Sequence, residues 1–142
     1  MKRIYTILFT FIILLVVNSC TKEEPIGFQI CGMYINQNHL DNENGYLDTL
    51  IIEPGKEFSH SQGTDDYILW YGHWYCKENE NIIVFEYLTE TYYKNHKKVY
   101  FSQLENDYCY GQLDGEILKY KEYYEDDWED YEWFIKVWDY FK

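Results

Sequence analysis

The sequence contains no alanine at all among its 142 residues. Alanine has the highest helix propensity of any residue, so its absence removes the commonest builder of helices. Phenylalanine, tryptophan and tyrosine instead make up 21% of the chain, and aromatic and β-branched residues are enriched in strands. The composition therefore predicts a domain that is mostly β.

Arginine is nearly absent too, because Arg3 is the only one. Without the first 19 residues, which hold Lys2 and Arg3, the 12 basic residues fall to 10 against 25 acidic ones, a net charge of −15. Nucleic-acid binding needs Lys and Arg to neutralise phosphates. Only the arginine guanidinium can form a bidentate pair of hydrogen bonds with a carboxylate or a phosphate. We expect no nucleic-acid partner. The charge either attracts basic proteins or simply keeps a tyrosine-rich chain soluble.

Recognisable catalytic and metal-binding motifs are also lacking. Cys31, Cys76 and Cys109 form no Cys-x-x-Cys pair, which leaves at most one intramolecular disulfide among otherwise buried thiols. The ordered Asp-rich loop of calcium sites is missing. The histidines lack metal-ligand spacing, and we interpret each of them as incidental: His39, His60, His73 and His96. The sequence predicts a protein without metal or cofactor that is not an enzyme.

Residues 1–19 have the form of a targeting segment. Lys2 and Arg3 precede an apolar run of about 14 residues, which is shorter than the roughly 20 that a spanning helix needs. The run ends at Val17-Asn18-Ser19-Cys20, which resembles a bacterial lipobox. That resemblance implies cleavage before Cys20 and attachment of lipid to it, with residues 20–26 as a tether to the membrane. The alternative is an ordinary signal peptide.

The tether carries a further short pattern at Lys22-Glu23-Glu24. It resembles the export signal of surface-exposed lipoproteins in one large group of Gram-negative bacteria. The resemblance implies an outer-membrane lipoprotein displayed on the cell surface, and the alternative is a solvated spacer on a periplasm-facing protein.

Residues 27–142 are of a length for one domain, divided by turn signals such as Asn44-Gly45 and Asp114-Gly115. We expect about eight strands within these segments: 28–37, 46–52, 56–61, 67–77, 82–91, 98–104, 108–113 with 116–124, and 131–141. Connections this short exclude parallel crossovers. The expected fold is all-β, an antiparallel up-and-down sheet curled into a small barrel or half-barrel. Helical spacing over 124–138 leaves a C-terminal helix as an alternative.

Several of these segments resemble the lipocalin-like β domains of bacterial lipoproteins. The matching stretches are Gly32-Met33-Tyr34, Leu50 to Phe58, Gly72-His73-Trp74 and Ile83-Val84-Phe85. The resemblance covers residues 32–85. It implies an antiparallel barrel or half-barrel without an enzymatic site.

Two groups of residues are candidates for binding. Alternation along 67–75 places Tyr71, His73 and Tyr75 on one face, where they form an exposed aromatic row or else one side of a strand packed on both faces. The second group interleaves acids and rings: Asp126, Asp127, Trp128, Glu129, Asp130 and Tyr131. It is either a docking patch or a solvated loop.

These features predict a membrane-anchored, non-enzymatic module that binds a basic protein, as an immunity lipoprotein binds a toxin. Acidic side chains steer such a partner and aromatic rings anchor it. One alternative is a lipocalin-like carrier of a small apolar ligand. The other is a glycoside hydrolase that uses two carboxylates, since the separation of such a pair is set in three dimensions.

Overall fold

A computed structural model describes residues 29–39, 47–77, 81–122 and 131–139. The signal segment, Cys20, Lys22, Glu23, Glu24 and residues 126–130 lie outside these ranges. Among the described residues, no helix has both the length and the apolar character that crossing a membrane requires.

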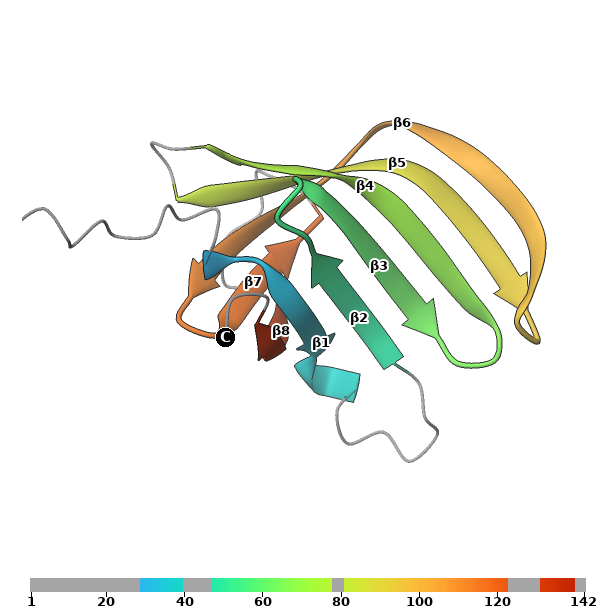
Figure 1. Cartoon of the computed structure of the whole chain (residues 1–142), viewed down its shortest axis with the longest axis horizontal. Helices are drawn as coiled ribbons and strands as arrows, with labels where there is room; N and C mark the ends of the chain where they lie inside the picture. The colour runs from blue at the N-terminus through green and yellow to red at the C-terminus, as the bar shows by residue number, and fades with distance from the viewer. Residues whose placement is uncertain (1–28, 40–46, 78–80, 123–130, 140–142) are drawn as a thin grey trace, which may run out of the picture.

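Eight antiparallel strands form a closed barrel in which each strand pairs with its neighbours in the chain and β1 pairs with β8 (Figure 1). The strands are β1 Gly32–Asn36, β2 Leu47–Ile52, β3 Glu57–Gly63, β4 Tyr67–Lys77, β5 Ile82–Lys94, β6 Lys97–Asp114, β7 Ile117–Lys121 and β8 Glu132–Asp139, with a short 3-10 helix, η1 Gln37–His39, after β1. The expected up-and-down barrel is confirmed, and the half-barrel alternative is wrong.

Turn chemistry explains two of the hairpins. Asn95 and His96 both have positive φ, 48° and 61°, as a two-residue type I′ turn requires, and they join β5 to β6. Asp114 pairs with Ile117 across Gly115, whose φ is 63°. Both turns match the breaks expected from the sequence.

One expected break is wrong, because Glu105-Asn106-Asp107 does not end a strand. The segments expected at 98–104 and 108–113 are one continuous strand, β6. Opposite them, β5 advances from Tyr87 to Thr89 while β6 advances from Gln103 to Asp107, so the extra residues bulge and pairing continues on both sides. Asn106 takes a φ of 58° within this bulge.

The ambiguous C-terminal segment is a strand over its described part, so the helical alternative is wrong there. Glu132–Asp139 pairs with β7 on one side and β1 on the other, and this closes the barrel. Ladder hydrogen bonds to two neighbours outweigh the weak helical spacing of Tyr131, Ile135 and Trp138.

Inward-facing aromatic side chains fill the barrel. Phe58 meets Phe85 and Tyr87 edge to face, with ring centroids 5.2 and 4.9 Å apart, and Tyr120 meets Phe134 at 5.4 Å. Such pairs add stability beyond the burial of their area.

Strands β4, β5 and β6 extend beyond the barrel at the right of Figure 1. We call their outer portions, Tyr67–Leu69, Thr91–Lys94 and Lys97–Phe101, the projecting sheet. Within the described residues, Tyr110–Asp114 is the only part of β6 that pairs with β7. In the described part of the chain, the outer portion of β6 is therefore paired on one side only, with β5.

Candidate functional site

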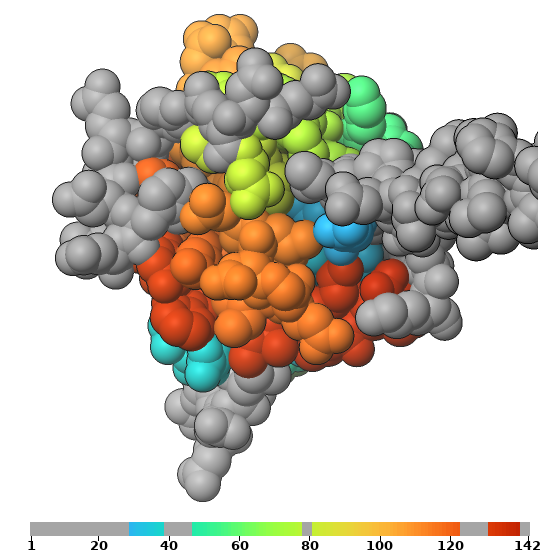
Figure 2. All heavy atoms as spheres, turned by 90° about the vertical axis from the view of Figure 1, so that its left-hand side faces the viewer, coloured from blue at the N-terminus to red at the C-terminus, as the bar shows by residue number. Residues whose placement is uncertain are grey.

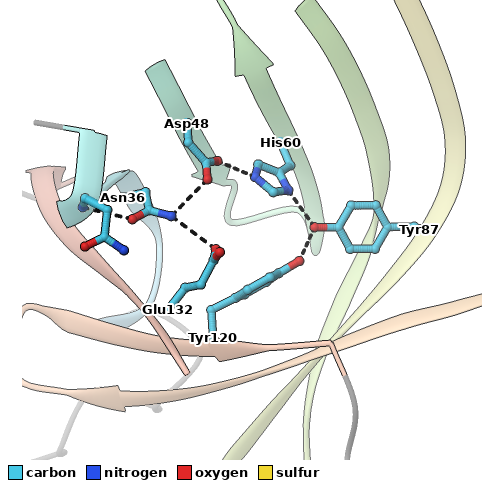
Figure 3. Close-up of polar contacts among 7 residues, drawn as sticks. Asn36, Asp48, His60, Tyr87, Tyr120 and Glu132 are labelled. Carbon is cyan, nitrogen blue, oxygen red and sulfur yellow. Dashed lines mark hydrogen bonds and ion pairs between the residues drawn. The ribbon is translucent and has the colours of Figure 1, made fainter. Parts of the chain in front are cut away.

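A chain of polar side chains runs through the barrel interior and links four strands (Figure 3). His60 of β3 lies at its centre, with Nε2 2.6 Å from Asp48 Oδ1 and Nδ1 2.8 Å from the Tyr87 hydroxyl. The Tyr87 hydroxyl in turn contacts that of Tyr120 on β7. We call Asp48, His60, Tyr87 and Tyr120 the buried polar chain.

A second arm extends the chain toward β1. The Asn36 side-chain amide donates to Asp48 Oδ2 at 3.0 Å and to Glu132 Oε2 at 3.1 Å (Figure 3). Its Oδ1 accepts the backbone N–H of Asn38 in η1 at 3.1 Å. Both oxygens of the Asp48 carboxylate are thus hydrogen-bonded inside the barrel, as is usual for buried polar groups.

Burial keeps the two tyrosines of the buried polar chain, Tyr87 and Tyr120, protonated. It raises the pKa values of Tyr87 and Tyr120 well above 10, and desolvation is the largest cause for both. The Cys109 thiol beside them has its pKa raised to about 12, again chiefly by burial. A buried thiol that stays neutral matches the expectation of a structural cysteine.

The buried polar chain has the donor and acceptor order of a general base, carboxylate to imidazole to hydroxyl, but it lies within the packed core. Asp48 is 1% exposed and His60 8%, and the Trp70 ring lies 5.1 Å from the His60 ring. We interpret the chain as a structural network that fixes how β2, β3, β5 and β7 meet.

The interpretation of His60 as incidental is therefore wrong. Successive residues of the buried polar chain lie 12 to 33 positions apart in sequence, so no local motif marks them. The one available signal is alternation, since Asp48 and His60 occupy inward positions among apolar neighbours in β2 and β3.

Tyr71, His73 and Tyr75 stand together on the outer side of β4. All three are exposed, whereas Gly72 and Trp74 between them are buried. Tyr71 is 53% and Tyr75 42% exposed, so the interpretation of a strand packed on both faces is wrong here. Alternation over this stretch is as expected.

Carboxylates and further tyrosines lie beside these three residues on the same face. His73 pairs with Glu57 of β3 on one side and Glu86 of β5 on the other, and Glu86 pairs with Tyr108 of β6. The Tyr108 hydroxyl donates to Glu86 Oε1 at 3.3 Å, and the Glu86 charge raises the pKa of Tyr108. We call this surface the tyrosine face, made of Tyr71, His73, Tyr75, Glu86, Tyr108 and Tyr110.

The second predicted group, the acidic segment, lies outside the described residues except for Tyr131. The Tyr131 ring stacks on Trp133 at 5.4 Å, and Lys119 Nζ lies 5.2 Å from its centroid. These contacts hold Tyr131 against β7 and β8, partly buried.

No group of three His, Cys, Asp or Glu side chains within the described ranges is arranged to hold a metal ion. Comparison with models of known protein families, with curated proteins and with solved structures gives no match. The chemistry of the surfaces is therefore what supports a function.

Proposed function

We propose that this chain is a lipid-anchored, extracytoplasmic binding protein that docks a basic protein partner on the tyrosine face. The main observation behind this proposal is that Tyr71, His73 and Tyr75 are exposed in one row, between the carboxylates of Glu57 and Glu86. The anchor in this proposal is lipid on Cys20, with Lys22, Glu23 and Glu24 directing the protein to the cell surface.

Two physical arguments support a basic partner. Tyrosine presents a large, rigid ring at little entropic cost and still offers a hydroxyl, which is why it is enriched at the centres of interfaces. The net charge of −15 left without residues 1–19 attracts a positively charged protein over several ångströms before contact. A secreted basic toxin held by an immunity protein is one form of this pairing.

A pull-down from the envelope and medium of the native organism tests the partner. We expect a basic protein to be retained at about 0.1 M salt and largely released at about 1 M, where the Debye length falls from about 10 Å to about 3 Å. Tyr71→Ser with Tyr75→Ser should weaken binding by roughly tenfold or more.

The matched control is Tyr100→Ser, because Tyr100 is 45% exposed but lies on the projecting sheet. The proposal predicts unchanged binding for this variant. Equal loss in both variants, or an extractable apolar small molecule retained at high salt, would defeat it. Reproducible turnover of a glycan substrate abolished by one Asp or Glu change would instead identify an enzyme.

The anchor has its own test. Cys20→Ser should move the protein out of the membrane fraction, and protease treatment of intact cells should digest the wild-type domain if it is on the surface. A processed Ser variant that still sediments with membranes would contradict the lipid anchor. Protection until the outer membrane is broken would contradict surface display.

A further inference from the structure

Two cysteines from distant parts of the chain belong to the same packed cluster. Cys31 lies just before β1 and is fully buried in the core. Cys76, near the end of β4, is partly buried and packs against that core. Neither takes part in the buried polar chain or the tyrosine face.

Backbone pairing and one side-chain contact bring their strand ends together. Gly32, which follows Cys31, pairs with Ile52 of β2. The next residue after Ile52 is Glu53, whose backbone carbonyl accepts a hydrogen bond from the Trp74 indole N–H at 2.9 Å. Cys76 follows Trp74 by two residues in β4, so the side chains of Trp74 and Cys76 lie on the same, inward face of the strand.

The views agree with this connection. Figure 1 shows the start of β1 and the end of β4 at the same end of the barrel. In Figure 2, which looks onto that end, the beginning of the described chain (blue) and the region where β4 ends and β5 starts (yellow-green) share one face.

Electrostatics separates this pair from the third cysteine. Burial raises the pKa of the Cys31 thiol to about 11, and a charge on Cys76 is near enough to contribute to that rise. The groups that act on Cys109 are Tyr120, Asp107, Glu122 and Tyr87, and no cysteine is among them.

We propose that Cys31 and Cys76 form a disulfide in the mature protein, and that this bond ties the segment entering from the membrane tether to strand β4. The proposal rests on the proposed extracytoplasmic location, because disulfides persist in such compartments and not in the cytosol. Cys109 remains a thiol.

Exposure sets the order of the reaction. The thiolate of the partly exposed Cys76 attacks a disulfide of an external oxidant, such as oxidised glutathione or a disulfide-bearing oxidase, and one thiol of the oxidant leaves. The thiolate of Cys31 then attacks the Cys76 sulfur of the mixed disulfide and expels the second thiol. In all, the two cysteine thiols give two electrons to the disulfide of the oxidant, and their two protons end on the two thiols that it releases.

The test uses the full chain carrying Cys20→Ser, kept in detergent and equilibrated with oxidised and reduced glutathione. Peptide mapping without reductant should find Cys31 joined to Cys76 and Cys109 alkylated as a thiol. Alkylation of all three cysteines after equilibration, or a bridge that contains Cys109, would overturn the proposal.

Thermal unfolding supplies a second readout. Closing this loop should raise the Tm of the oxidised protein over that of the reduced one by on the order of 10 °C or more. Cys31→Ser and Cys76→Ser should each abolish the dependence on redox state, and Cys109→Ser should retain it. A wild-type Tm that is the same in the oxidised and reduced protein would contradict the Cys31–Cys76 disulfide.

The redox buffer replaces the cellular compartment, so failure here leaves the anchor and the basic partner standing. Conversely, a protein that carries no lipid and binds no partner can still form the Cys31–Cys76 disulfide in the redox buffer. The two proposals therefore fail separately.

Discussion

The barrel and the projecting sheet share strands β4, β5 and β6, yet they are stabilised in different ways. In the barrel each strand has two neighbours, and its inward side chains meet those of strands far away in the sequence. In the projecting sheet the outer part of β6 pairs, among the residues that the structure describes, only with β5, and Val99, Tyr100 and Phe101 are 45 to 56% exposed. The same strands are thus a packed core at one end and an open surface at the other.

One pair of interactions makes the contrast quantitative, because each region holds a histidine beside an aspartate. His60 Nε2 lies 2.6 Å from Asp48, with both side chains at most 10% exposed. His96 Nε2 lies 3.4 Å from Asp65 at the tip of the projecting sheet, where the side chains are 68% and 81% exposed. Identical chemistry should matter greatly in the first place and little in the second.

The largest expected effect is alkaline unfolding of the barrel. Burial raises the pKa values of Tyr34, Tyr87 and Tyr120 above the ordinary value of 10. Below pH 10 both states keep these protons and stability is intact, whereas above it the unfolded chain ionises first. Stability should then fall by about 1.4 kcal/mol per pH unit for each tyrosine.

Circular dichroism and tyrosinate absorbance followed together check this. We expect a late phase of tyrosine ionisation that coincides with loss of β structure. If all the tyrosines ionise while the barrel stays folded, their burial is not what stabilises it.

Removing the buried carboxylate comes next. Asp48→Ala leaves His60 and Asn36 without their partner in the core and should cost about 3–5 kcal/mol of unfolding free energy. The matched change at the tip, Asp65→Ala, should cost less than about 1 kcal/mol. Urea denaturation measures both, and similar losses would erase the distinction between the two regions.

Crowding in the barrel wall gives a smaller effect. A Cβ on Gly72 would lie 1.9 Å from the Glu86 carbonyl oxygen and 2.7 Å from the Phe58 ring. Gly72→Ala should therefore cost about 1–3 kcal/mol by overpacking. Gly55→Ala in the β2–β3 turn meets nothing within 4 Å and should stay within about 0.5 kcal/mol, and denaturation midpoints compare the two.

The smallest effect on stability, with a clear effect on association, concerns the edge of β6 that no other described strand covers. Charge and irregular pairing protect such edges, and β6 has Lys97, Lys98 and an extra residue at Val99 opposite the Tyr92–Tyr93 step. Replacing both lysines by threonine should leave unfolding free energy within about 0.5 kcal/mol and increase self-association.

Sedimentation measures that association. Lys94→Thr is the control, because Lys94 lies at the same turn but on β5, which pairs on both sides. A double variant that remains as monomeric as this control would show that the lysines do not guard the edge.

Much of the fold could be predicted from the sequence. The absence of alanine and the density of aromatic and β-branched residues exclude a helical domain, because both preferences act residue by residue. Turn residues such as Asn95, His96 and Gly115 fix where strands reverse, since their positive φ is a local property. Short connections then force neighbouring strands to pair antiparallel. For the same reason, alternation alone predicted that Tyr71, His73 and Tyr75 share a face.

Tertiary structure decided what depends on pairing between distant segments. Glu105-Asn106-Asp107 has the composition of a turn, but hydrogen bonds to β5 on both sides carry β6 through it as a bulge. His60 looks like any other histidine until closure of the barrel sets Asp48 and Tyr87 on either side of its ring. Its partners come from β2 and β5, and only the register of the closed sheet determines which inward side chains meet.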